Sequence, residues 1–324
     1  MNGVEGLDLE TLRKGGKLQL SRALSLLEQS PGEMLGLLSD SYHAPRAQVV
    51  GVTGPPGVGK STLLAELIRT YRAEGRTVGV IAVDPSSKRS GGAFLGDRVR
   101  FSTDPEDQGV FVRSMAARDR LGGLADLTIA AMVLMRAVFD IVLIETVGVG
   151  QSETDVSGVT DTVVFCVQPG SGDSLQFMKA GIAEIPHIAL VTKADMGKAA
   201  ERTKADLRGA LSLASEDGGD WDVKILALSS SDKTGLGDFV AAVDEHYRWL
   251  QAQGKLSDQR QQQAKQWLKE AVRDLFGKVG LRFLKETDLS LELADGQSPF
   301  DLLSQIQKEL VFSRRSRGFE KSLS

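Results

Sequence analysis

The sequence has very few side chains that form disulfides or bind metals. It contains one cysteine, Cys166, and three histidines among 324 residues. A single cysteine can form neither a disulfide framework nor a Cys-x-x-Cys metal site within the chain. Because Cys166 lies in the apolar run TVVFCVQ, we expect it to be a buried small hydrophobic residue. His43, His187 and His246 are too scattered to predict a metal cluster, so ordinary core or surface positions are expected for them.

Long hydrophobic runs are also lacking. The most apolar stretch, residues 129–144, is interrupted by Arg136 and Asp140, so no membrane-spanning segment is expected. The first ten residues, MNGVEGLDLE, are acidic and lack the hydrophobic segment of a signal peptide. A formal net charge of -4 argues against non-specific binding to nucleic acid or to an anionic membrane. We therefore expect a cytoplasmic protein with no nucleic-acid partner and no membrane partner.

The middle of the chain alternates short apolar runs with helix-like stretches. Seven runs are rich in β-branched residues and almost continuously apolar, as expected for parallel strands buried on both faces. Helix-like stretches such as 60–74 and 123–138 separate them and give repeated βα units. The sequence therefore predicts an α/β fold with a mainly parallel, about seven-stranded sheet flanked by helices. The runs are QVVGVTG, TVGVIAVD, VFVRSM, IVLIETV, TVVFCVQ, HIALVTKA and VKILALS.

The segment GPPGVGKS matches the phosphate-binding pattern G-x-x-x-x-G-K-[ST], between an expected strand and an expected helix. Glycines allow backbone N–H groups to curl around phosphate oxygens, and the helix N-terminus adds positive partial charge. We expect Lys60 to reach the β- and γ-phosphates as a catalytic group, and the Ser61 hydroxyl to bind Mg²⁺. The chain is therefore predicted to be a P-loop NTPase. The expected nucleotide contacts here are Gly54, Pro55, Pro56, Gly57, Val58, Gly59, Lys60, Ser61 and Thr62.

Helical regions are expected on both sides of this domain. The predicted division is an N-terminal helical extension over 1–44, the P-loop domain over 45–250 and a C-terminal helical region over 251–324. In the last region an apolar stripe runs from Ala264 to Leu275, with Gly277 as the expected helix end. Ser298-Pro299 is expected to start the final helix. The stripe can pack within the chain or against a second subunit, and the sequence leaves both open.

Acidic residues at strand ends can supply the carboxylates that Mg²⁺ requires beside phosphates. Asp84 ends VIAVD, Glu145 ends IVLIE, and Asp97 lies in the loop SGGAFLGDRVR. Together with Ser61 they form the expected metal site, and Asp84 and Asp97 are also expected to be catalytic. Each acid alone could instead be a helix cap.

The segment TVGVGQSE follows directly after the strand that Glu145 ends. Gly148 can bring a backbone N–H close to a γ-phosphate, and Gln151 can orient an attacking water as a catalytic residue. A glycine turn with an exposed glutamine is the alternative, and the sequence does not choose between the two.

The segment VTKAD follows an apolar run at the place where a GTP-binding protein reads its base. The Asp195 carboxylate can accept hydrogen bonds from guanine N1–H and the exocyclic amine, which adenine does not offer. Lys193 can lie along the base. Thr192 stands where an amide usually ties this loop to its neighbours, so weaker support of the loop is expected. A capped turn with an unrelated aspartate is the alternative. A second base-contacting loop is expected in ALSSSDKTGLG, at Ser229 and Ser230.

Taken together, these motifs resemble the MeaB/ArgK family of P-loop GTPases, the GTPase chaperones of adenosylcobalamin-dependent acyl-CoA mutases. The resemblance spans about residues 18–240. It implies GTP hydrolysis coupled to a mutase of the methylmalonyl-CoA mutase type, with the nucleotide gating the loading of intact cofactor and the rejection or removal of damaged cofactor. The matching stretches are GVTGPPGVGKSTL, VDPSS, GGAFLGDRVRF, FVRSMAARDRLGGLA, IETVGVGQSE and GSGDSLQFMKAGIAEI.

The resemblance also implies residue roles and an oligomeric state. Lys60 and Ser61 serve phosphate and Mg²⁺, and a homodimer forms through the C-terminal helices. The sequence departs from the family pattern at VTKAD and at AEIPHI. The implied metal and switch set is Asp84, Asp97 and Glu145, and the implied partner-responsive residues in loop 171–182 are Asp173, Gln176 and Lys179.

A cobalamin-anchoring Asp-x-His-x-x-Gly motif is missing from the sequence. The nearest string is DEHYRW, which has Trp249 where glycine is needed. We therefore expect GTP or GDP and Mg²⁺ as ligands, and no cobalamin bound by this chain itself.

Three other functional classes fit the residues less well. A nickel-handling GTPase depends on Cys and His ligands that this chain lacks. A protein-targeting GTPase, in which Thr-Lys-x-Asp is familiar, would need a methionine-rich region, and the whole chain has seven methionines. A small-molecule kinase, an older label in the resembled family, would transfer phosphate to an acceptor rather than to water.

Overall fold

The computed structural model describes residues 6–84, 101, 104, 106–116, 126–146, 156–170, 186–214, 221–286, 291–294 and 296–320. The chain divides into two compact units. One comprises Arg46–Leu256, and the other comprises Met1–Pro45 together with Ser257–Ser324. The helical segments from the two ends of the sequence therefore belong to one unit. Among the described residues, no helix is long and apolar enough to cross a membrane.

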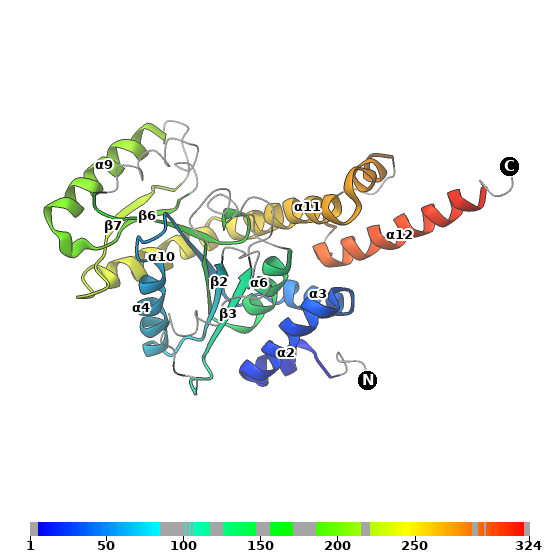
Figure 1. The fold of residues 1–324 in the computed structure, drawn as a ribbon, viewed down its shortest axis with the longest axis horizontal. Helices are drawn as coiled ribbons and strands as arrows, with labels where there is room; N and C mark the ends of the chain where they lie inside the picture. The colour runs from blue at the N-terminus through cyan, green and yellow to red at the C-terminus, as the bar shows by residue number, and fades with distance from the viewer. Residues whose placement is uncertain are drawn as a thin grey trace. The chain divides into compact units, whose positions relative to one another are not determined.

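A seven-stranded sheet forms the centre of the 46–256 unit (Figure 1). Its strand order is β3-β2-β4-β1-β5-β6-β7, and every pairing is parallel. The predicted α/β fold with a parallel, seven-stranded sheet is thus confirmed. The chain order changes direction at β1, which is where parallel sheets form a ligand crevice at the carboxyl ends of their strands. The strands are β1 (Gln48–Thr53), β2 (Val78–Asp84), β3 (Val110–Ala116), β4 (Ile141–Glu145), β5 (Thr162–Val167), β6 (Ile188–Val191) and β7 (Lys224–Ala227).

Helices cover both faces of this sheet, as strands buried on both sides require. Of the helices that the structure describes in this unit, one pair packs on one face and a second pair on the other. The first pair is α4 (Lys60–Ala73) and α10 (Leu236–Ala252), and the second pair is α6 (Asp126–Val138) and α9 (Lys198–Ala214). Successive residues of β2 face opposite sides of the sheet. Val78 and Val80 belong to the core beneath α4 and α10. Gly79 faces Met135 and Phe139 on the other side.

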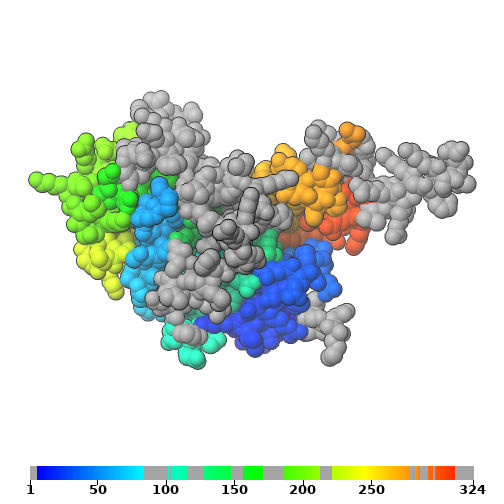
Figure 2. Space-filling view, viewed as in Figure 1, coloured from blue at the N-terminus to red at the C-terminus, as the bar shows by residue number. Residues whose placement is uncertain are grey.

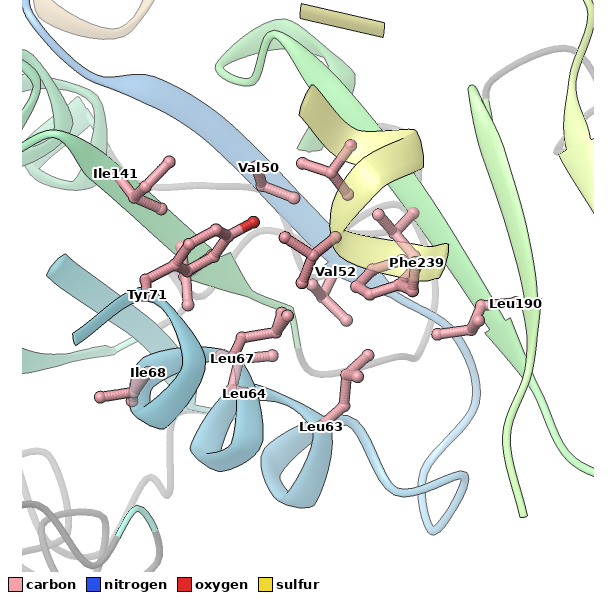
Figure 3. Packing of buried hydrophobic residues seen from close by; sticks show 14 of the residues in the cluster. Val50, Val52, Leu63, Leu64, Leu67, Ile68, Tyr71, Ile141, Leu190 and Phe239 are labelled. Atoms are coloured by element: carbon pink, nitrogen blue, oxygen red, sulfur yellow. The ribbon is translucent and has the colours of Figure 1, made fainter. Parts of the chain in front are cut away.

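The core beneath α4 and α10 holds the phosphate-loop helix against the strands (Figure 3). Leu64, Leu67 and Tyr71 follow the spacing of one helix face, and they point from α4 toward Val50 and Val52 of β1. All five side chains are fully buried. The opposite, polar faces of α4 (light blue) and α10 (yellow) form part of the surface in Figure 2. This packing fixes the start of α4 relative to the end of β1.

The other unit is built from helices of both chain ends. Asp301 Oδ2 accepts hydrogen bonds from the hydroxyls of Ser39 and Ser298, each 2.6 Å long. The ring of Trp267 packs on that of Phe300 with centroids 4.8 Å apart. The Ser39–Asp301 contact joins segments that are 262 positions apart in the sequence. The helices are α1 (Leu9–Lys14), α2 (Gly16–Gln29), the 3-10 helix η1 (Pro31–Met34), α3 (Leu35–His43), α11 (Lys255–Glu286) and α12 (Pro299–Glu320).

Helix ends in this unit match the sequence patterns at Ser298 and Gly277. Ser298 caps α12 as predicted, because its Oγ accepts a hydrogen bond of 3.1 Å from the Asp301 N–H. Gly277 breaks the helix as predicted: it has φ 61° and ψ −151°, which are not helical, and two helices that meet at this kink together make up α11. Most of the apolar stripe is buried, but Leu275 at its end is 54% exposed.

Candidate nucleotide-binding site

The phosphate loop connects β1 to α4 and depends on its glycines. Gly57 and Gly59 have φ angles of 78° and 98°, in the region that favours glycine. Gly54 has φ 135°, and a Cβ atom there would lie 2.2 Å from the Cys166 carbonyl oxygen. Within the described part of the chain, no side chain caps the N-terminus of α4. The first amides of this helix are therefore suited to phosphate oxygens.

Lys60 is the first residue of α4 and is 6% exposed. Its Nζ donates hydrogen bonds to the carbonyl oxygens of Gly54 at 2.7 Å and Pro55 at 3.0 Å. The ammonium group is thus held against the phosphate loop. Val58 is completely buried, so only its backbone can contact a nucleotide. Pro56, Gly57 and Thr62 are exposed on the loop and helix start.

Ser61, in the first turn of α4, and Glu145, at the end of β4, come together. The Ser61 hydroxyl donates a hydrogen bond of 2.7 Å to Glu145 Oε1. The pairing of Val52 with Glu145 puts this carboxylate next to the end of β1, and the side chain is 5% exposed. A hydroxyl and a buried carboxylate are hard oxygen donors, so the pair fits a Mg²⁺ ion beside the phosphates. Among the described side chains, no group of three or more His, Cys, Asp or Glu residues converges.

The Thr192 hydroxyl links the segment VTKAD to the phosphate loop. Thr192 is 4% exposed, and its Oγ1 lies 2.6 Å from the Val58 carbonyl oxygen and 3.0 Å from that of Val167. A hydroxyl has one proton, so it can donate to either carbonyl. The expected weaker support stays a prediction; the structure adds that the Thr192 hydroxyl lies within hydrogen-bond distance of both neighbouring elements and donates to one of them at a time.

The two residues expected to contact the base lie at the surface. Lys193 has φ 54° and ψ 44°, a left-handed conformation that is uncommon for a residue with a side chain. Its Nζ donates hydrogen bonds to the Gly57 carbonyl oxygen at 3.2 Å and to Gln168 Oε1 at 2.5 Å. Asp195 follows in the 3-10 helix η4 (Ala194–Met196) and is exposed. Its carboxylate is therefore accessible to a ligand.

The second expected base loop begins directly after β7. The Ala194 N–H donates a hydrogen bond of 3.1 Å to the Leu228 carbonyl oxygen, which brings the two loops together. Ser229 is fully buried, and its hydroxyl lies 2.8 Å from that of Ser231. Ser230 is partly exposed. Of the two predicted serines, Ser230 is thus the one with an accessible side chain.

Several predicted site residues lie outside the described residues. Asp84 ends β2, and its backbone pairs with that of Ala116, but its side chain is not described. The described ranges also exclude Asp97, Gly148, Gln151, Asp173, Gln176 and Lys179. The expected catalytic, metal and switch roles of these residues therefore stay predictions.

Sequence reasoning misses one polar contact of the site and one buried pair elsewhere. Gln168 receives no role from the motifs, although its position directly after β5 is a signal that it borders the strand ends. His187 and His246 stack with centroids 4.1 Å apart, while Thr162 Oγ1 lies 2.9 Å from His246 Nδ1. Burial lowers the pKa of His187 to about 4 and that of His246 to about 3. Burial likewise raises the pKa of Cys166 to about 12, so the thiol stays protonated.

Comparisons with known proteins agree with this arrangement. Residues 20–281 match the family model described as methylmalonyl Co-A mutase-associated GTPase MeaB. A protein of Pyrococcus horikoshii that is named as a GTPase is 37% identical over 309 residues, which cover 94% of this chain and 97% of the relative. GTPase ArgK of Escherichia coli is 32% identical over 298 residues, covering 88% and 90% of the two chains.

A solved structure shares the fold over almost its whole length. The crystal structure of an LAO/AO transport system kinase has a TM-score of 0.68 and 26% identity, and the match covers 96% of this chain and 98% of the other. The family model covers most of the sequence, including the phosphate loop, the Ser61–Glu145 pair and the segment VTKAD. The chain therefore belongs to the MeaB family of P-loop GTPases.

Proposed function

We propose that this GTPase is a chaperone that assembles with an adenosylcobalamin-dependent acyl-CoA mutase of the methylmalonyl-CoA mutase type. In this proposal the bound nucleotide gates cofactor loading and the protection or reactivation of the mutase. Membership of a family described by its association with methylmalonyl Co-A mutase supports the partner. The observation that carries the nucleotide chemistry is the hydrogen bond of 2.7 Å between Ser61 and Glu145, beside the phosphate loop.

The described residues suit the binding and hydrolysis of a triphosphate. Lys60 Nζ already lies against the loop at Gly54 and Pro55, and in this proposal it exchanges these carbonyl oxygens for phosphate oxygens. Ser61 and Glu145 hold Mg²⁺, with Asp84 and Asp97 as further proposed ligands. When bound, the metal neutralises charge that develops on the phosphates. Gln151 is the proposed group that orients water, and Gly148 the proposed γ-phosphate contact.

Base recognition is proposed to come from Lys193 and Asp195. The exposed Asp195 carboxylate accepts two guanine N–H groups, and the Lys193 stem lies along the ring. Ser229 and Ser230 contact the base from the second loop. Ser229 does so through its backbone, because its side chain is buried. Adenine does not offer these N–H groups, so with adenine the carboxylate would lose its hydrogen bonds. This arrangement therefore selects guanine over adenine.

We propose a homodimer and a partner-responsive loop as the means of coupling. Leu275, 54% exposed at the end of an otherwise buried stripe, is a candidate subunit contact. The loop containing Asp173, Gln176 and Lys179 is the proposed segment that senses the mutase. A cytoplasmic location is proposed on the basis of the single cysteine, since an oxidising compartment favours paired cysteines.

Co-elution with a purified mutase tests the partner. The chain is mixed with an adenosylcobalamin-dependent methylmalonyl-CoA mutase in the presence of GDP or a non-hydrolysable GTP analogue, and the mixture is separated by size. We expect a complex whose yield depends on the nucleotide. Separate elution in every nucleotide state would contradict the chaperone proposal while leaving the GTPase activity untouched.

Phosphate release tests the chemistry against a kinase alternative, which the name of the similar solved structure suggests. We expect release from GTP with Mg²⁺ and no acceptor, little release from ATP, and none from the Lys60→Ala variant. Turnover only after addition of a small-molecule acceptor would favour the kinase. Asp195→Asn should move preference from GTP towards xanthosine triphosphate, and full retention of GTP selectivity would remove the base-reading role.

A further inference from the structure

Gln168 lies between the two loops of the nucleotide site. It follows β5 directly, and β5 is paired with β1 on one side and with β6 on the other. The phosphate loop starts after β1, and the segment VTKAD continues from β6. The backbone before Gln168 is anchored, because the Thr192 N–H donates a hydrogen bond of 2.8 Å to the Val167 carbonyl oxygen. The carboxamide therefore extends from a fixed point.

The Lys193 ammonium group bridges both of these elements. It donates to Gln168 Oε1 at 2.5 Å and to the Gly57 carbonyl oxygen at 3.2 Å. An ammonium group has only donors, so it must face the oxygen of the carboxamide. The left-handed backbone at Lys193, with φ 54°, persists only where the surroundings determine it. Gln168 and the Gly57 carbonyl oxygen are the described groups that hold this side chain.

We propose that Gln168 is a positioning residue for base recognition. It holds the Lys193 ammonium between the end of β5 and the phosphate loop, and so keeps the lysine stem in place along the base. A free lysine samples many rotamers, and fixing it before the ligand arrives removes part of the entropic cost of binding. The role rests on the proposed reading of guanine by Lys193 and Asp195.

The choice of an amide has a consequence for the charge. The carboxamide oxygen of Gln168 accepts the hydrogen bond without neutralising the ammonium group. Leucine has a similar size but has no acceptor atom. Glutamate retains an acceptor oxygen at the same reach. Gln168→Leu should therefore weaken GTP and GDP binding by about fivefold, and Gln168→Glu should remain within about twofold of the parent.

Steady-state kinetics and nucleotide titration separate positioning from folding. We expect Gln168→Leu to raise KM for GTP by about fivefold with kcat unchanged, because the phosphate and metal groups are intact. Gln251→Leu, an exposed glutamine on α10, is the matched control and should leave KM at the parent value. A changed thermal unfolding midpoint for Gln168→Leu together with a lowered kcat would overturn the proposal in favour of a structural role.

A double-mutant cycle with Lys193→Met shows whether Gln168 acts through the lysine. We expect Gln168→Leu to cause no further loss in the Lys193→Met background, because the interaction is already absent. Additive losses would overturn the proposal. Asp195→Asn provides the distinction from the proposed function: if that variant shifts toward xanthosine triphosphate while Gln168→Leu has parental KM, only the role of Gln168 is wrong. If Asp195→Asn keeps full GTP selectivity, base reading by this segment fails first.

Discussion

The Thr192 hydroxyl lies 2.6 Å from the Val58 carbonyl oxygen, although the two residues are 134 positions apart in the sequence. This contact joins the segment proposed to read the base to the loop proposed to bind the phosphates. Val58 and Thr192 are both buried, so water cannot easily replace the bond. The contact therefore fixes the position of the proposed base-reading segment relative to the proposed phosphate loop.

Replacing this hydroxyl should loosen the site. Thr192→Val keeps the shape and leaves the carbonyl oxygens of Val58 and Val167 without the donor, so we expect about tenfold weaker GDP binding. Isothermal titration gives the dissociation constant. Thr192→Ser retains the hydroxyl and serves as the control. Equal affinities for the valine and serine variants would argue that the hydroxyl is not needed.

The Ser61–Glu145 pair predicts a dependence on Mg²⁺. Glu145→Gln preserves the size of the side chain but removes the anionic ligand, so the Mg²⁺ concentration for half-maximal GTP hydrolysis should rise by at least about tenfold. A Mg²⁺ titration of phosphate release measures this shift. Glu106→Gln, an exposed residue distant in sequence from the pair, is the control. A parental Mg²⁺ requirement in the Glu145 variant would exclude the carboxylate from the metal site.

The stacked histidines predict a loss of stability in mild acid. His187 and His246 have folded-state pKa values of about 4 and 3, against 6.5 for the ordinary side chain. The unfolded state thus binds more protons below neutral pH. Their contribution is fully present above about pH 6.5 and falls as the pH decreases toward 4, by roughly 2–3 kcal/mol for each ring.

Denaturant titrations at several pH values check this effect. His246→Phe removes one titrating ring, so the free energy of unfolding of this variant should decline less steeply between pH 7 and pH 4 than that of the parent. Lys224, Glu245 and Asp161 lie near these rings or on the elements packed against them, and they remain in both proteins. Identical slopes would show that other groups determine the acid sensitivity.

Gly54 should tolerate no side chain. A methyl group there would lie 2.2 Å from the backbone oxygen of Cys166, which cannot rotate away, and φ is 135°. Gly54→Ala should lower the free energy of unfolding by about 2–4 kcal/mol and abolish nucleotide binding. Gly209→Ala in α9, where nothing lies within 4 Å of the added carbon, should instead preserve or slightly increase stability. Thermal unfolding with and without GDP compares the pair, and an equally stable Gly54 variant would contradict the packing argument.

Local patterns were enough to predict the sheet and the phosphate loop. Continuous apolar runs identify buried parallel strands because both faces of such a strand are shielded from water. The phosphate loop needs positive φ angles, and glycine at positions 54, 57 and 59 allows them. The same reasoning gave Ser298 as a helix cap, since a cap is formed within three residues. It also gave Gly277 as the end of a helical segment, because glycine readily adopts the positive φ at which the helix breaks.

Partnerships across the chain depended on the tertiary structure. The sequence by itself determined the strands, the glycine-rich loop and the residue types available for phosphate, metal and base. Only the fold decided that Thr192 would meet Val58, that Gln168 would hold Lys193, and that two scattered histidines would stack. These contacts arise where parallel strands end side by side or where a helix covers a strand. The residues that make them are far apart along the chain, so local sequence patterns do not reveal them.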